Sequence, residues 1–221
     1  MNNNEFSSHK PPKDCWNAHL LENAQYSKTG LPLFKCSESI PPDVVSFKNV
    51  SQSPDNSKWV HFYENDNLLE LVWESPEFYT NNLRRFPGII SPDLSIYRDM
   101  PQPLQSFNNY RNRVLAHWFS EQGFNVIPNI RWGDENTYPF CFDGIEANKP
   151  VCVSTLGTLR HKEDRECFRR GFAEMVKRLS PSVIIIYGQM PADIFSDYQI
   201  SGIPFFHFDT DAQKAQKRRR V

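Results

Sequence analysis

The chain has 221 residues, a length that suits one domain with a sizeable hydrophobic core. Its formal net charge is −1, so no overall field favours binding to nucleic acid or to a membrane surface. No apolar run approaches the roughly 20 residues that span a bilayer. The N-terminal segment MNNNEFSSHKPPKD also lacks the apolar core of a signal peptide. We therefore expect a cytoplasmic protein that makes no membrane contact.

The cysteine pattern indicates neither a disulfide framework nor a metal site. The chain has five cysteines, an odd number, and no pair of them has CxxC spacing. A disulfide-stapled domain or a zinc site would show a paired pattern. We expect buried, reduced thiols and predict no metal site.

The first part of the chain, residues 1–58, carries paired prolines, many Ser and Asn residues and only scattered apolar positions. This composition predicts an irregular N-terminal extension that packs on the rest of the molecule. The following segment, 59–209, is predicted to form the folded α/β domain, and residues 210–221 a basic C-terminal tail.

Within the predicted domain, short β-branched or aromatic runs alternate with amphipathic helices, which is typical of a largely parallel α/β sheet or barrel. Polar residues follow nearly every run, and neither GxGxxG nor GxxxxGK[ST] occurs. These features favour an incomplete TIM-like barrel over a doubly wound sheet with one switch point. The runs are WVHFY (59–63), GIIS (88–91), NVIPNIRW (125–132), VCVST (151–155), SVIIIYG (182–188) and IPFFHFD (203–209).

Three helices are predicted with defined limits or faces. Asp66 stands where an N-cap would precede the helical stretch NLLELVWE. The longest helix should cover about 103–122, with Leu104, Phe107, Val114 and Trp118 on its apolar face. A third helix, about 163–179, ends before Pro181.

The segment SPDLSIYRDMP (91–101) follows the second run and contains Asp93 and Arg98. A carboxylate at a strand end could act as a base or hold a cation, and an arginine could bind anionic oxygen. The alternative is structural: Asp93 caps a turn and Arg98 pairs with Asp99 on the surface. The pattern leaves both interpretations open.

The segment IRWGDENTY (130–138) brings Arg131, Trp132 and Asp134 close together after the third run. These residue types suit a planar or phosphorylated ligand, with stacking by Trp132, charge from Arg131 and proton transfer by Asp134. The alternative is a salt bridge at the strand end with Trp132 in the core.

Two further strand ends contribute candidates. Thr155, in the segment STLGT before a helix, could bind phosphate together with backbone N–H groups, and Tyr187 ends SVIIIYG with a hydroxyl donor. The tail supplies Lys217, Arg218, Arg219 and Arg220, which could contact a nucleic-acid backbone or simply remain solvated.

Several blocks of the chain resemble an uncharacterised domain-of-unknown-function family of bacterial, phage and mobile-element proteins. The blocks are WVHFYENDNLLELVWESP, GIISPDLSIYRDMP, YRNRVLAHWFSEQGFNVIPNIRWGDENTYPFCFDGI, KEDRECFRRGF and IIIYG. The resemblance covers roughly Cys15 to Asp209 and implies an accessory protein of a phage or mobile element that acts inside the bacterial cell. It implies no reaction, cofactor or catalytic residue.

Three functional hypotheses remain open. The first is an enzyme or binding protein for a phosphorylated or nucleotide-like compound, with Asp93, Asp134 and Tyr187 as catalytic groups and Arg98, Arg131, Trp132 and Thr155 as ligand-binding groups. The second is a nucleic-acid accessory protein that uses the basic tail. The third is a protein-interaction or inhibitor module without catalysis. The sequence names no cofactor and no oligomeric state. The first hypothesis requires the strand-end groups to meet at one rim.

Overall fold

The computed structural model describes residues 14–219, and their strands are all parallel within two hydrogen-bonded sheets. One sheet has four strands in the order β1-β2-β3-β4, and the other has three in the order β5-β6-β7. The strands are β1 Val44–Ser46, β2 Trp59–His61, β3 Gly88–Ile90, β4 Asn125–Ile127, β5 Val151–Ser154, β6 Ile184–Tyr187 and β7 Phe205–Phe208. The prediction of a largely parallel α/β fold is confirmed.

The two sheets meet where the chain leaves β4. An isolated parallel bridge joins Asn129 to Cys152, with hydrogen bonds from Ile130 N to Cys152 O (2.8 Å) and from Cys152 N to Pro128 O (2.9 Å). The strands therefore follow one another in chain order across both sheets, as they do in a TIM-like barrel. Within the described residues the barrel is not closed, because no strand pairs β7 with β1.

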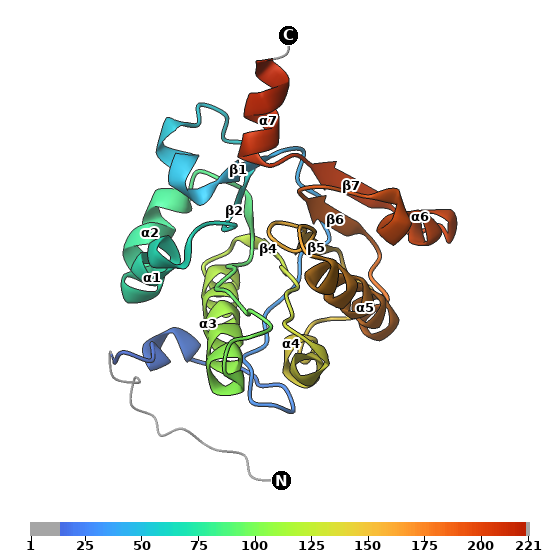
Figure 1. The fold of residues 1–221 in the computed structure, drawn as a ribbon. Coiled ribbons are helices and arrows are strands. Elements are labelled where there is room, and N and C mark those ends of the chain that lie inside the picture. Colours follow the sequence, from blue (N-terminus) through green and yellow to red (C-terminus); the bar gives the residue numbers. More distant parts are fainter. Residues whose placement is uncertain (1–13, 220–221) are drawn as a thin grey trace.

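Helices connect the strands and lie around the outside of the sheets (Figure 1). They are η1 Ala18–Leu21, η2 Phe47–Gln52, α1 Asp66–Glu74, α2 Pro76–Leu83, α3 Gln102–Glu121, η3 Glu135–Thr137, α4 Tyr138–Cys141, α5 Lys162–Leu179, α6 Ala192–Ile200 and α7 Asp211–Arg218. In residues 14–219, none of these is both long enough and apolar enough to traverse a bilayer.

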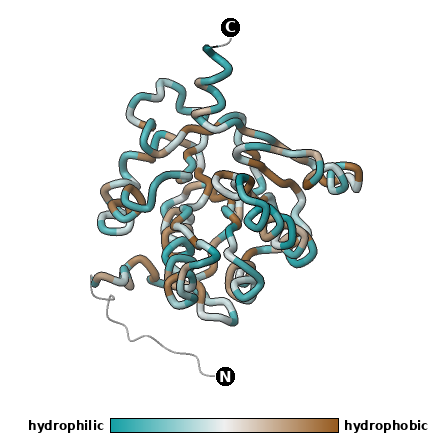
Figure 2. The backbone as a smooth tube through the Cα atoms, viewed as in Figure 1, coloured by the Kyte–Doolittle hydropathy of each residue, from teal (hydrophilic) through white to brown (hydrophobic). Residues whose placement is uncertain are grey.

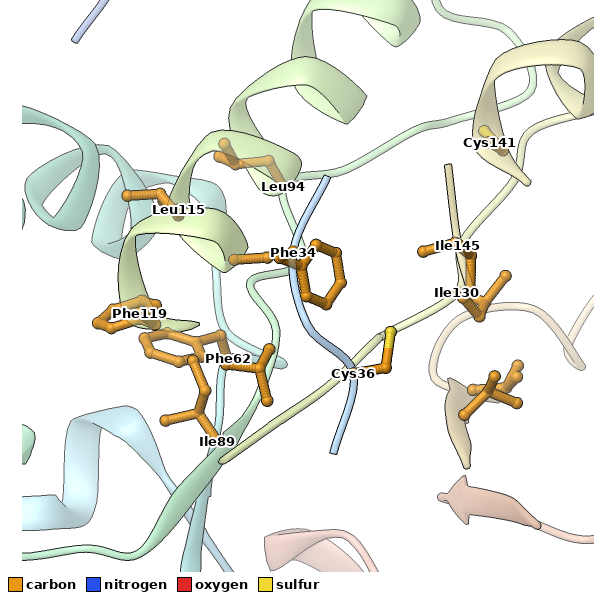
Figure 3. Packing of buried hydrophobic residues seen from close by; sticks show 14 of the residues in the cluster. Phe34, Cys36, Phe62, Ile89, Leu94, Leu115, Phe119, Ile130, Cys141 and Ile145 are labelled. Carbon is orange, nitrogen blue, oxygen red and sulfur yellow. The ribbon is translucent and has the colours of Figure 1, made fainter. Parts of the chain in front are cut away.

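Each face of the strands is buried by a different set of side chains, as a period of two along a strand requires. Val60, Ile89 and Val126 belong to the large core between strands and helices, part of which is drawn in Figure 3. The opposite face carries a second cluster, in which Tyr63 after β2 stacks on Tyr187 of β6 with ring centroids 4.7 Å apart. Because β2 and β6 lie in different sheets, this contact shows that the sheets curl towards each other.

Two segments expected to lack regular structure contain elements of it. Residues 44–46, inside the predicted irregular extension, form β1 and pair with β2 in register Val44↔Trp59. A strand of three residues is too short to show alternation in the sequence. The predicted tail forms α7, because Thr210 and Gln213 make a reciprocal capping box at its start.

Helix α7 lies where a closing strand would be needed, between β7 and β1 (Figure 1). Lys214 Nζ is 3.3 Å from Asp43 Oδ1, and Asn49 Nδ2 donates to Asp211 Oδ2 at 3.1 Å. Figure 2 shows α7 as a hydrophilic segment above the hydrophobic strands. The helix spans the opening of the barrel by polar contacts and adds no apolar core.

Two helix predictions are wrong in detail. The N-cap of α1 is Asn65, whose side chain accepts from Asn67 N, so Asp66 is the first helical residue. In α3 the predicted face was apolar, but Leu104 is 52% exposed while Gln105, Asn108 and Asn112 are buried. Buried polar groups need partners, and these three amides bind the backbone of the loop that follows β3.

Candidate functional site

A cavity of about 280 Å³ lies at the carboxyl ends of β3, β4 and β5, beside the first turns of α5. Its lining includes four of the residues singled out from the sequence: Asp93, Arg98, Arg131 and Trp132. Parallel strands present their carboxyl ends at one edge, which is where ligands of α/β proteins bind. The cavity is therefore the candidate site.

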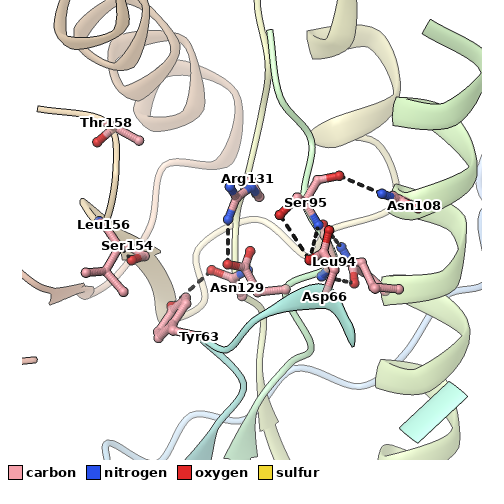
Figure 4. A network of polar contacts seen from close by, with 12 residues as sticks. Tyr63, Asp66, Leu94, Ser95, Asn108, Asn129, Arg131, Ser154, Leu156 and Thr158 are labelled. Atoms are coloured by element: carbon pink, nitrogen blue, oxygen red, sulfur yellow. Dashed lines mark hydrogen bonds and ion pairs between the residues drawn. The ribbon is translucent and has the colours of Figure 1, made fainter. Parts of the chain in front are cut away.

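A buried carboxyl group organises the cavity floor. Asp93 is 6% exposed, and its Oδ2 accepts from Arg131 Nη1 at 2.6 Å while its Oδ1 accepts from Asn129 Nδ2 at 2.6 Å. Tyr63 donates its hydroxyl to Asn129 Oδ1 at 3.0 Å, so the chain of contacts runs from the curled interior to Arg131 (Figure 4). Both carboxyl oxygens of Asp93 are thus engaged in holding neighbours.

The charges of this pair depend on each other. Burial raises the pKa of the Asp93 carboxyl above its ordinary value, and Arg131 and Asn129 oppose that rise. Burial acts to lower the pKa of the Arg131 guanidinium, but the acidic groups around it, Asp93 foremost, together raise it. Arg131 is consequently a fixed cation whose side chain is 24% exposed.

One wall of the cavity is a loop that α3 holds by its backbone. Asn112 accepts from Leu94 N at 2.8 Å and donates to Leu94 O at 3.1 Å. Asn108 donates to Ser95 O at 2.7 Å, which Figure 4 also shows. Gln105 Nε2 donates to Tyr97 O at 2.6 Å. These amides recur at three-to-four spacing along one helix face, and they set the position of the loop that carries Asp93 and Arg98.

The opposite wall is the loop after β5. Ser154, Leu156 and Thr158 lie across the cavity from Arg131 (Figure 4). Thr155 does not line the cavity: it is 4% exposed, and its hydroxyl donates to Gln189 O at 2.8 Å. The hydroxyl residues that line the cavity are instead Ser154, which immediately precedes Thr155, and Thr158, which follows it by three residues.

Trp132 lines the cavity as a fixed wall. Its indole lies flat against α5, where a Cβ at Gly171 would be 2.0 Å from Trp132 Nε1, and its ring is 5.4 Å from that of Phe168. This close approach requires glycine at position 171. The packing leaves Trp132 9% exposed, so it has little free ring face for stacking on a ligand.

Asp134 and Tyr187 lie outside the cavity lining. Asp134 caps η3 by accepting from Asn136 N at 3.0 Å. Tyr187 is 3% exposed and lies in the second core cluster, with its ring 4.3 Å from the ring of His61. Burial raises the pKa of Tyr187, whose hydroxyl lies near the backbone of Asp211. The structure thus separates these two candidates from Asp93 and Arg131.

Arg98 lies at the cavity rim and pairs with α5. Its Nη2 is 3.1 Å from Glu163 Oε2 and 3.3 Å from Asp164 Oδ1. The surface pair that the sequence suggested with Asp99 is not the one formed. The Arg98 contacts join the loop after β3 to the start of α5.

The described basic residues of the C-terminal segment do not line the cavity. Lys217 pairs with Asp209, while Arg218 and Arg219 are exposed at the end of α7. Arg220 lies outside the described residues. Helix α7 contacts the opening between β7 and β1, away from the cavity-lining loops.

Several lining residues were not among the site residues predicted from the sequence, among them Asn129, Tyr97, Cys167 and Asp164. Asn129 could have been predicted from the sequence, because it is a polar residue two positions before Arg131 at the same strand end. Cys167 had no such signal: its thiol donates to Gly133 O at 2.9 Å, and burial raises its pKa. Among residues 14–219, no three His, Cys, Asp or Glu side chains gather in a group suited to a metal ion.

Comparison with known proteins gives a family and two phage relatives. A family model described as a domain of unknown function (DUF4417) matches residues 24–209. The "Gene 1 protein" of Mycobacterium phage L5 is 34% identical over 135 residues, which are 61% of this chain and 59% of that protein. The "Gene 1 protein" of Mycobacterium phage D29 is 34% identical over 131 residues, or 59% of this chain and 48% of that protein. The chain thus spans about half to three fifths of these relatives. No solved structure matches it.

Proposed function

The chain belongs to the DUF4417 family of domains of unknown function. From this premise, we propose that it binds a small phosphorylated or nucleotide-like ligand in the cavity after β3, β4 and β5. The observation that carries the proposal is the orientation of Arg131. A buried carboxylate holds one guanidinium nitrogen, while the side chain remains 24% exposed beside a cavity. The phage relatives support action inside a bacterial cell.

The chemistry of the lining suits such a ligand. Arginine binds phosphate oxygens through its planar fork, and a carboxylate behind it fixes the direction of that fork. Ser154 and Thr158 place hydroxyl groups opposite Arg131, and Tyr97, 53% exposed, offers an aromatic ring with the Arg131 guanidinium 5.8 Å from its centre. A volume of about 280 Å³ fits a compound about as large as one nucleotide.

Asp93 serves in this proposal as a positioning residue. Because each of its oxygens accepts a hydrogen bond at 2.6 Å, the carboxyl group is occupied in orienting Arg131 and Asn129. We propose binding as the function and assign no proton transfer to Asp93. Asp134 and Tyr187 have no part in the proposed site, because the cavity lining does not include them.

Calorimetric titration and thermal shift with ribonucleotides and sugar phosphates test the proposal. A ligand that binds only the folded protein must raise its melting temperature. Arg131→Lys keeps the charge but loses the fork, and we expect it to weaken binding roughly tenfold to a hundredfold. Arg169→Lys is the matched control, since Arg169 lies on the exposed side of α5 and pairs with Glu166.

Two outcomes would remove the proposal. One is that no compound of either class binds the wild-type chain at low ionic strength. The other is that Arg131→Lys and Arg169→Lys bind equally well. A single-stranded oligonucleotide in the same titration separates pocket binding from binding through α7, because only the latter would fall on Lys217→Ala and Arg218→Ala.

A further inference from the structure

The rim of the cavity holds a second arginine, Arg98, whose ion pairs differ from that of Arg131. Arg98 is 46% exposed, and its partners Glu163 and Asp164 are 79% and 34% exposed. By the same side-chain measure, Arg131 and its partner Asp93 are 24% and 7% exposed. Exposed ion pairs contribute little, because water screens them and both side chains must be ordered. The Arg98 pairs are therefore easily exchanged, and the Arg131 pair is not.

The geometry leaves one edge of Arg98 available for a new partner. Its hydrogen bonds to Glu163 and Asp164 both start from Nη2. Within residues 14–219, no hydrogen bond is formed by the other guanidinium nitrogens of Arg98. Arg98 and Asp164 both line the cavity, so this edge belongs to the same site as Arg131.

We propose that Arg98 binds a second anionic group of the ligand and releases Glu163 and Asp164 when it does so. This inference rests on the proposed function and specifies the ligand class: compounds with two phosphoryl groups, such as nucleoside diphosphates, over those with one. Arg131 anchors one phosphoryl group in the cavity, and Arg98 receives the other at the rim. The rim also carries three carboxylates, those of Glu163, Asp164 and Asp99. They disfavour anionic ligands that do not contact Arg98, and so they add to the selectivity for diphosphates.

The carboxylates of Glu163 and Asp164 should weaken the binding of a diphosphate, because they occupy Arg98. Replacing Glu163 and Asp164 with Gln and Asn frees Arg98 from its present partners. We expect the double variant to bind a diphosphate about twofold to fivefold more tightly than the wild type does, and to show a smaller gain for a monophosphate, which benefits only from the loss of the two negative charges. Glu166→Gln is the matched control, since Glu166 lies on the same helix and pairs with Arg169 instead.

The experiment measures dissociation constants for the four ribonucleoside monophosphates, the four diphosphates, inorganic phosphate and pyrophosphate. The wild type should prefer each diphosphate that binds by roughly tenfold over its monophosphate. Arg98→Met should weaken diphosphate binding more than monophosphate binding, so that this preference is lost. Thermal unfolding checks that each variant is folded.

The acids also lie in the first turn of α5, where their removal strengthens the attraction of the helix end for anions. The triple variant, with Arg98→Met added, separates the two causes. A diphosphate gain that is as large without Arg98, or a diphosphate preference that survives Arg98→Met, overturns the inference and leaves the proposed function intact. Failure of these probes and of the sugar phosphates to bind the wild type overturns both.

Discussion

The carboxyl ends of the strands are hollow in one region of the molecule and filled in another. After β3, β4 and β5, the side chains of Asp93, Asn129 and Arg131 border a cavity. At β2 and β6, the rings of Tyr63 and Tyr187 stack at 4.7 Å. Both regions carry polar atoms at strand ends. A polar group at a strand end can therefore contribute to a binding site only where the neighbouring side chains leave space.

Different interactions hold the two regions. In the hollow region, amide side chains of α3 bind the loop backbone from outside, so the loop keeps its position without filling the space between the walls. In the filled region, aromatic rings from two sheets meet and α7 covers the opening beside them. Substitutions in the filled region should therefore affect stability, and those in the hollow region should affect ligand binding as well.

The largest expected effect is that of Tyr187→Ala in the filled region. Loss of a buried aromatic ring leaves a cavity, and we expect the free energy of unfolding to fall by about 3–5 kcal/mol in urea titrations. Tyr97→Ala is the control in the hollow region: Tyr97 is 53% exposed, and its loss should cost less than about 0.5 kcal/mol. Equal losses would contradict the distinction between the regions.

Arg131→Met should have the next largest effect on stability. It leaves the buried Asp93 carboxyl without its cation, and we expect the free energy of unfolding to fall by about 3 kcal/mol. The double variant Asp93→Asn with Arg131→Met should recover much of this loss but none of the ligand binding. If the double variant is no more stable than the single one, the pair is not coupled as described.

His61 in the filled region should make stability depend on pH. Burial lowers its pKa from 6.5 to about 3, so the unfolded chain binds a proton more readily than the folded chain between these values. The contribution of His61 to the free energy of unfolding is therefore fully present above about pH 6.5. It is lost as the pH falls towards 3, by at most about 1.4 kcal/mol per pH unit. Unfolding titrations of His61→Gln should show a flatter pH profile than wild type. The exposed His161→Gln should keep the wild-type slope, and a slope unchanged in His61→Gln would refute the assignment.

Asn112→Ala tests the support of the hollow region and should have the smallest effect on stability. It removes two hydrogen bonds to the backbone of Leu94, and we expect a loss of about 1–2 kcal/mol. Amide exchange of Leu94 should accelerate, and ligand binding should weaken because the loop with Asp93 is released. Asn136→Ala, on the exposed 3-10 turn after Asp134, is the control. Unchanged exchange at Leu94 in Asn112→Ala would show that the loop does not depend on α3.

The sequence by itself determined the class of fold, the alternation of strands and helices, and the edge at which a site would lie. Short β-branched runs and amphipathic helices carry this information locally, through their periods of two and 3.6. For the same reason it placed Asp93 and Arg131 at the ends of neighbouring strands, and both line the cavity in the structure. It also indicated the resemblance to a domain-of-unknown-function family, which the match to residues 24–209 confirmed, and the link to phage proteins, which the two mycobacteriophage relatives support.

Only the tertiary structure decided which strand ends are open. Tyr187 ends β6 and Asp93 follows β3 by three residues, so both stand near the carboxyl end of a strand. The curl of the two sheets brings Tyr63 onto Tyr187, while a cavity lies beside Arg131. The buried face of α3 was also undetermined, because Gln105, Asn108 and Asn112 look like solvent-facing residues until the loop that they bind is in place. Both outcomes depend on contacts between residues far apart in the chain, and local periodicity does not encode such contacts.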